Sequence, residues 1–269
     1  MVDFVVYSNT DFEDILQIQT DQLSGKGNLT LLINKSEQNL DHIYNRYDKV
    51  IFYNNSNTYP GRLKECIEQI DQKYFILIHE HDILLNVDLP IIEKFFEFIK
   101  QNDLDRIDLK QSMSLENKKF IKINNIDDFF TWIEKPSDED FHDNIYFTIQ
   151  KDPDDYIYNV NPSIWKRDSI LDIVSTFQHR NYRDIENIDV QHFCTKFKVL
   201  RLYSKNALNC GYYNCLNIFK FLHITHSGKL LPFNSTFTTV YGQSYEHAKE
   251  DYIKIIDKYN LRQSNKWVN

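Results

Sequence analysis

Short apolar runs alternate with amphipathic stretches over residues 1–110 of the chain. Strands are predicted at Phe4–Tyr7, Leu29–Ile33, Lys49–Tyr53, Tyr74–Ile78 and Leu104–Lys110. Helices are predicted at Phe12–Gln22, Arg62–Gln72 and Pro90–Gln101, where apolar residues recur every three or four positions. Because alternating strands and helices favour parallel pairing with helices on both faces, the pattern predicts an α/β fold with a mixed, mostly parallel sheet.

Residues 111–269 have a less regular pattern. A helix is predicted over Lys166–Phe177, a strand over Lys198–Tyr203 and a C-terminal helix over Tyr245–Tyr259. The acidic stretch 112–155 is typical of loops. We find no internal repeat and no linker that would divide the chain, so we expect a single domain with two halves, 1–110 and 111–269.

Composition supports a folded protein with a substantial core. Hydrophobic residues make up 42% and aromatic residues 14% of the 269 residues, which excludes global disorder. The four cysteines form no CxxC pair, so free thiols in a reducing, cytoplasmic setting are expected. The N-terminus has the pattern of a strand rather than of a signal peptide. With no apolar stretch of about 18 residues, no transmembrane segment is expected.

The formal net charge of −8 argues against general nucleic-acid binding. Such binding needs clustered lysines and arginines to neutralise phosphates, and the chain has no extended basic block. An acidic protein can still bind a nucleotide when a divalent cation supplies positive charge locally.

Four metal-capable side chains directly follow the most apolar predicted strand: His79, Glu80, His81 and Asp82. The strand Tyr74–Ile78 is apolar on both faces, which is typical of a central strand covered by helices. Ligands of open α/β sheets bind beyond the carboxyl ends of such strands. Carboxylates among apolar neighbours need a cationic partner, and hard oxygen ligands suit Mg²⁺ or Mn²⁺.

An apolar strand followed by Glu80-His81-Asp82 and a second apolar step resembles the DxD region of GT-A glycosyltransferases. The resemblance covers most of the chain, from about Phe4 to Leu231, and implies a GT-A, Rossmann-like fold. It implies that Asp82 and Glu80 bind Mn²⁺ or Mg²⁺ against the diphosphate of a nucleotide-sugar, with a UDP-sugar as the expected donor. His81 takes the variable middle position of the motif, and Arg62 would face the nucleotide.

Other segments are similar to the same family. The segment Asn161–Asp168 resembles an acceptor-side loop, with Trp165 at the acceptor. The stretch Tyr182–Asn187 matches the position of the general base, for which Glu186 is favoured and Asp184 is the alternative. The remaining positions implied by the resemblance are His226 as a metal ligand, Lys229 as a phosphate contact, and Tyr7, Ser8 and Asn9 near the nucleoside.

The resemblance therefore implies a metal-dependent glycosyltransferase that moves a sugar to a hydroxyl of a glycan or other acceptor. An inverting reaction is favoured because a base is available at Glu186. Residues 1–110 would then form the nucleotide-sugar half and residues 111–269 the acceptor half.

Simpler roles compete at several of these positions. His79 can be a core histidine, Trp165 a packing aromatic and Glu186 part of a solvated helix face. His79, His81 and Asp82 also suit a zinc metallohydrolase. A third hypothesis is a GT-A-like binding module without activity. Glu80, which replaces the first aspartate of the motif, is compatible with this hypothesis.

Overall fold

A computed structural model describes the backbone of residues 1–111, 120–123, 131–133, 145–203, 209–210, 213–214, 218–223, 225–226, 229–230 and 245–261. Side chains are described for residues 1–110, 146–203, 218–222 and 249–261. Statements about structure below refer to these residues.

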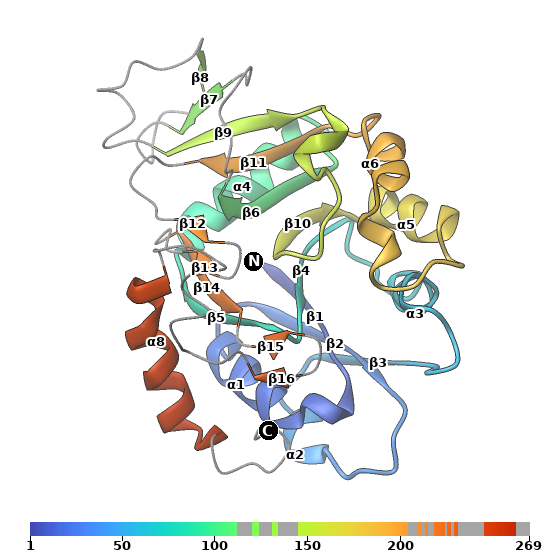
Figure 1. Cartoon of the computed structure of the whole chain (residues 1–269), viewed down its shortest axis with the longest axis vertical. Helices are drawn as coiled ribbons and strands as arrows, with labels where there is room; N and C mark the ends of the chain where they lie inside the picture. The colour runs from blue at the N-terminus through green and yellow to red at the C-terminus, as the bar shows by residue number, and fades with distance from the viewer. Residues whose placement is uncertain are drawn as a thin grey trace.

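The centre of the molecule is a ten-stranded sheet with the strand order β3-β2-β1-β4-β10-β6-β11-β9-β7-β8 (Figure 1). Its strands are β1 (Asp3–Tyr7), β2 (Asn28–Asn34), β3 (Lys49–Tyr53), β4 (Tyr74–His79), β6 (Arg106–Gln111), β7 (Phe120–Ile123), β8 (Thr131–Ile133), β9 (Ile145–Gln150), β10 (Ser163–Lys166) and β11 (Val199–Tyr203). Strands β3, β2, β1, β4, β6 and β11 share one direction, whereas β10 and β9 run against them. The predicted α/β class with a mixed, mostly parallel sheet is confirmed.

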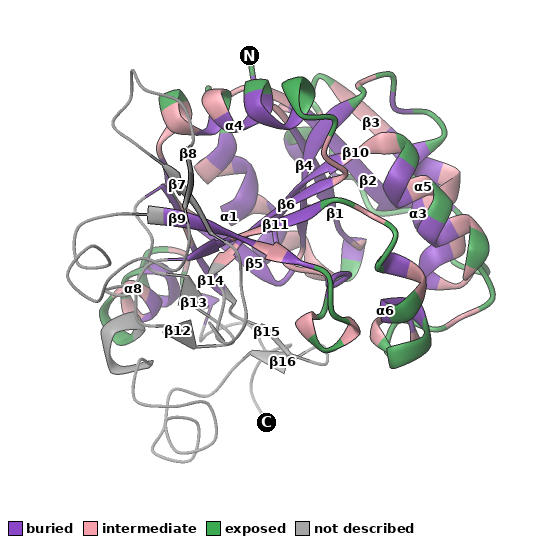
Figure 2. Ribbon diagram, turned by 90° about the horizontal axis from the view of Figure 1, so that it is seen from above, coloured by how far each residue is buried: buried purple, intermediate pink, exposed green. Residues whose placement is uncertain are grey.

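Helices cover both faces of this sheet (Figures 1 and 2). Leu16 of α1, Ile43 of α2 and Phe95 of α4 pack on one face, in one core cluster. Leu63 of α3, Ile173 of α5 and residues of α6 form a second cluster on the other face. The α-helices are α1 (Glu13–Leu23), α2 (Asp41–Tyr44), α3 (Tyr59–Ile67), α4 (Leu89–Gln101), α5 (Arg167–Thr176), α6 (Ile188–Cys194) and α8 (Tyr245–Lys258), and the short 3₁₀ turns are η1 (Thr10–Phe12), η2 (Pro153–Asp155) and η3 (Asp184–Glu186).

Alternation along each strand produces the two cores. In β1, Phe4 and Val6 belong to the first cluster, while Val5 and Tyr7 belong to the second. Successive side chains of a strand point to opposite faces, so a strand buried on both faces must be apolar throughout. All six residues of β4 are buried, and all but the last, His79, are apolar or aromatic.

Strand β10 corrects one prediction. The segment Asn161–Asp168 was expected to be a loop entering a helix, but Ser163–Lys166 is a strand between β4 and β6. Trp165 pairs with Phe75 on one side and with Arg106 on the other. Four residues are too few to show a strand periodicity, and only the tertiary pairing reveals this element.

The chain changes sheets at the candidate motif. Strand β4 ends at His79, Glu80 and His81 form a turn, and β5 (Asp82–Val87) begins at Asp82. Strand β5 belongs to a second sheet with the order β12-β13-β14-β5, in which His223 pairs with Asp82. The other strands outside the central sheet are β12 (Asn209–Cys210), β13 (Tyr213–Asn214), β14 (Phe219–His223), β15 (Thr225–His226) and β16 (Lys229–Leu230).

In the part of the chain described here, the helices are all too short or too polar to cross a membrane.

Candidate active site

The turn Glu80–His81 lies at the carboxyl end of the central strand β4. Gln19 of α1 holds this turn, since its Nε2 donates to the carbonyl of His79 at 2.7 Å and to that of Asp82 at 2.8 Å. Gln19 is only 1% exposed, so both bonds are shielded from water. A single side chain of α1 therefore holds the main chain at both ends of the turn.

Asp82 and His81 form a buried ion pair at this turn. The Asp82 side chain is fully buried, and its Oδ2 lies 3.2 Å from Nε2 of His81. Burial acts to lower the pKa of His81, but the carboxylates of Asp82, Glu80 and Glu186 together hold that pKa above its ordinary value. A protonated His81 is the cationic partner that Asp82 has within reach.

Glu80 is the second carboxylate of the turn. Burial raises the pKa of Glu80, and His81 opposes that change. Its Oε2 is buried and has no hydrogen-bond partner among the described residues. An unsatisfied buried carboxylate oxygen is costly, and a bound cation or a hydroxyl group would satisfy it.

A layer of tyrosines surrounds His79. The hydroxyl of Tyr59 lies 2.6 Å from Nε2 of His79, and Tyr7 packs edge-to-face on Tyr59. Burial lowers the pKa of His79 to about 3, helped by the neighbouring His81, so His79 is neutral at ordinary pH. The His79 ring stacks on that of His81 at 5.6 Å and 12°. His79 thus acts as a packed core histidine that supports His81, and its Nε2 is engaged by Tyr59, which disfavours a zinc site.

Glu186 reaches the same region from the loop between α5 and α6. Its charge contributes to the raised pKa of His81, so the folded chain brings it close to the motif. The Glu186 Oε1 accepts a hydrogen bond from the main-chain N–H of Val160 at 2.9 Å. Asp184 is engaged in its own turn, where its carboxylate accepts from Asn181 and Asn187. Of the two acids considered for the base, Glu186 is the one whose charge acts on His81.

A short segment before β10 carries the partner of Glu186. Gln191 binds both the N–H and the carbonyl of Tyr158, at 2.9 and 2.8 Å. The hydroxyl of Tyr158 lies 3.5 Å from that of Tyr59, which contacts His79. The segment Ile157–Val160 therefore connects Glu186 with the layer beneath the acidic turn.

A buried ion network fixes that segment from below. Arg106 donates to the carbonyl of Ile157 and, at 2.6 Å, to Oδ1 of Asn159. Its Nη2 lies 3.4 Å from Oδ2 of Asp108, and both side chains are fully buried. The guanidinium also lies over Trp165, 4.6 Å from its ring centre.

Trp165 itself is 2% exposed. It was predicted to contact the acceptor, but in this structure it fills the core beneath the segment Ile157–Val160. An acceptor has no access to this ring.

The predicted nucleoside residues lie at the end of β1, the neighbour of β4. Tyr7 and Ser8 are buried, and Ser8 Oγ has no hydrogen-bond partner within the described residues. Asn9 accepts from the N–H of Asp11 and so begins η1. Arg62 donates to the carbonyls of Asn55 and Asn57 and lies over Tyr53.

His226 and Lys229 pair with each other in the hairpin of β15 and β16. Their side chains lie outside the described part of the chain, so their predicted roles stay predictions.

No group of three or more potential metal ligands occurs among the described side chains. Asp82 is nevertheless buried and Glu80, two positions before it, is partly buried with one buried oxygen, Oε2, that has no hydrogen-bond partner among the described residues. Carboxylate oxygens of this kind fit a hard divalent cation, which Glu80 and Asp82 would hold.

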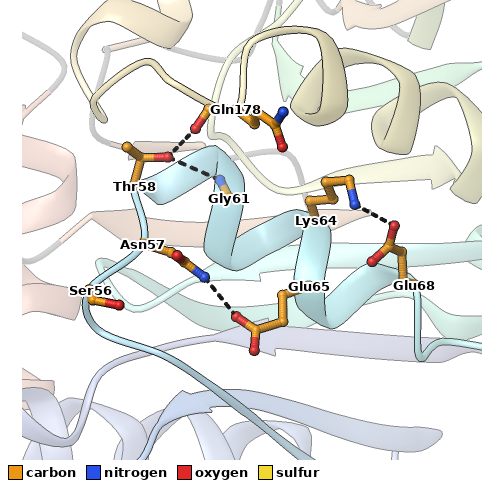
Figure 3. A pocket seen from close by; sticks show the side chains of 8 residues that line it. All are labelled: Ser56, Asn57, Thr58, Gly61, Lys64, Glu65, Glu68 and Gln178. Carbon is orange, nitrogen blue, oxygen red and sulfur yellow. Dashed lines mark hydrogen bonds and ion pairs between the residues drawn. The ribbon is translucent and has the colours of Figure 1, made fainter.

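A separate surface depression lies at the start of α3, with a volume of about 490 Å³. Its lining residues are Ser56, Asn57, Thr58, Gly61, Lys64, Glu65, Glu68 and Gln178 (Figure 3). The charged groups there pair with their neighbours, Lys64 with Glu68 at 2.5 Å and Glu65 with Asn57 at 3.1 Å. Thr58 also binds the carbonyl of Gln178, which ties the end of α5 to the start of α3.

No protein-family model and no curated protein matches the chain. Among solved structures, the chain is similar to S. aureus TarS 1–349, with 10% identity, a TM-score of 0.46, and coverage of 76% of this chain and 60% of that one. A TarS 1–349 structure in complex with UDP matches in the same way, with a TM-score of 0.45. A UDP-glucose pyrophosphorylase complexed with UDP-glucose matches with 12% identity, a TM-score of 0.41, and coverage of 76% and 91%.

Proposed function

We propose that the protein is a metal-dependent glycosyltransferase that takes a nucleotide-sugar, with a UDP-sugar as the expected donor. The observation that carries the proposal is the convergence of three carboxylates. Glu80 and Asp82 flank His81 at the carboxyl end of the central strand, and the charges of Glu80, Asp82 and Glu186 all raise the pKa of His81, which supports the proposal. Two acids could hold a cation that stabilises the leaving diphosphate, and a third could take the proton of the acceptor hydroxyl.

Glu80 and Asp82 would hold Mn²⁺ or Mg²⁺ at this turn. When bound, the ion offsets the negative charge that develops on the departing diphosphate. Gln19 would keep the two carboxylates in place, because it binds the main chain on both sides of the turn. His81, paired with Asp82 in this structure, would add positive charge beside the same phosphates.

Glu186 would act on the acceptor. In the proposed inverting reaction the acceptor oxygen bonds to the anomeric carbon and its proton passes to a Glu186 oxygen. The bond between the anomeric carbon and the phosphate oxygen breaks, and its electron pair leaves with the nucleoside diphosphate. The N–H of Val160 would orient the Glu186 carboxylate, since it donates to Oε1.

The end of β1 would receive the nucleoside. Tyr7 ends a strand directly beside β4, and Ser8 and Asn9 follow it, so a nucleotide bound there would lie near the acidic turn. Arg62 lies over Tyr53, which stacks on Tyr7 at 5.3 Å. The Arg62 guanidinium would therefore lie on the same side of the site as Tyr7.

Thermal melting against a panel of nucleotides tests the proposal. Each nucleoside diphosphate and nucleotide-sugar is added with Mn²⁺, with Mg²⁺ and with EDTA. A ligand that binds only the folded protein raises the melting temperature. We expect a metal-dependent rise with one nucleoside diphosphate that is absent in Asp82→Ala. A rise with zinc alone, and none with any nucleotide, would favour the metallohydrolase instead.

A further inference from the structure

Tyr182 is the outermost ring of the tyrosine layer around His79. The rings of Tyr7, Tyr53, Tyr59 and Tyr158 are at most 6% exposed, whereas Tyr182 is 41% exposed. Its ring packs edge-to-face on Tyr59, with centres 4.9 Å apart and planes at 80°. The ring is thus anchored on Tyr59, while the residue as a whole stays partly accessible.

The charges of three carboxylates act on this residue. Burial, followed by the charges of Glu80, Glu186 and Asp82, raises the pKa of Tyr182. The ring packs on Tyr59, whose hydroxyl lies 2.6 Å from Nε2 of His79, the residue before Glu80. Tyr182 also stands four positions before Glu186 in the chain.

The loop presents the ring in a fixed position. Asn181 Oδ1 accepts from the N–H of Arg183 at 2.9 Å and from that of Asp184 at 3.0 Å. The Asp184 carboxylate in turn accepts from the Asn181 side chain. An exposed aromatic ring held by a capped turn loses little conformational entropy on contact with a ligand.

A sugar ring matches these surroundings. A pyranose has an apolar C–H face and an edge of hydroxyl groups, so it can cover an aromatic ring while its hydroxyls donate to carboxylates. We propose that Tyr182 is the binding residue for the sugar ring of the donor and contacts its C–H face between the acidic turn and Glu186. This inference rests on the proposed function.

The test compares a donor with the same nucleotide lacking its sugar. Calorimetric titration in Mn²⁺ measures the dissociation constants of UDP and of the tightest of UDP-glucose, UDP-galactose and UDP-N-acetylglucosamine. For Tyr182→Ala we expect a weakening of about threefold to tenfold for the UDP-sugar and an unchanged value for UDP. Tyr182→Phe keeps the ring and should retain the affinity for the UDP-sugar.

Phe52→Ala is the matched control. Phe52 is 39% exposed and packs edge-to-face on Tyr44, but it lies on the outer strand β3. Its removal should change neither constant. Equal weakening for UDP and the UDP-sugar in Tyr182→Ala, no weakening at all, or a loss in Tyr182→Phe as large as in Tyr182→Ala would overturn the assignment. If the wild-type protein binds neither UDP nor any UDP-sugar, the proposed function itself fails.

Discussion

The side chain of Gln19 spans the acidic turn and binds the carbonyl of His79 at 2.7 Å. The same Nε2 binds the carbonyl of Asp82, three residues further on. A helix on one face of the sheet therefore determines where the candidate carboxylates stand.

Gln19→Leu should destabilise the protein and disorder the turn. Two buried carbonyls lose their donor, which costs about 1–3 kcal/mol in the free energy of unfolding. Urea unfolding measures this loss. Gln17→Leu is the control on the same helix, because its partly buried bond to Asp21 contributes only about 0.2–0.5 kcal/mol. Equal losses for the two variants would show that the clamp on the turn has no special weight.

Glu186→Gln should slow transfer strongly without unfolding the protein. The amide oxygen can still accept from the N–H of Val160, but the side chain can no longer take a proton. We expect turnover to fall by about 10²- to 10⁴-fold with little change in the melting temperature. Asp184→Asn should retain most activity, because Asp184 serves its own turn. The opposite ranking would make Asp184 the base.

The sequence reveals the acidic turn but not the residues that hold it. Parallel strands, helices and the motif at Glu80–Asp82 follow from apolar periodicity and from the end of a buried run. Gln19 is a polar residue within an amphipathic helix, and nothing local marks the two carbonyls that it binds. For Trp165 the sequence is misleading, because its segment has the pattern of a loop. Only the pairing of this segment with β4 and β6 places Trp165 in the core.

His79 should make the protein less stable in acid. The unfolded chain protonates this residue below a pH of about 6.5, but the folded protein protonates it only near a pKa of about 3. The unfolded state therefore binds more protons between these values, and stability falls as pH decreases, by up to about 1.4 kcal/mol per pH unit. Glu80 has the opposite effect on stability. Because its pKa is raised in the folded protein, the folded state binds its proton more readily than the unfolded chain, and protonation of Glu80 stabilises the fold as pH decreases.

The two effects are separated by working in a Glu80→Gln background. Urea unfolding from pH 6.5 to pH 4 compares this variant with Glu80→Gln/His79→Phe. We expect the double variant to lose less stability in acid. Parallel pH profiles would mean that His79 is protonated equally readily in both states.

Arg106→Met should be among the most destabilising single changes. It removes one partner of a fully buried ion pair and leaves the carbonyl of Ile157 without its donor. Such losses cost about 3–5 kcal/mol. Arg46→Met is the control, since its pair with Asp21 is about one-third exposed and should cost at most about 1 kcal/mol. A small effect at Arg106 in urea unfolding would contradict a structural role for the network.

The central claim is that Asp82 helps to bind a metal against the diphosphate of a nucleotide. Calorimetric titration of UDP into the wild-type protein and Asp82→Asn, with Mn²⁺ and with EDTA, tests it most directly. We predict that Mn²⁺ tightens binding to the wild-type protein at least about tenfold and has no such effect on Asp82→Asn. The same metal dependence in both proteins, or no UDP binding by the wild type, would contradict the account.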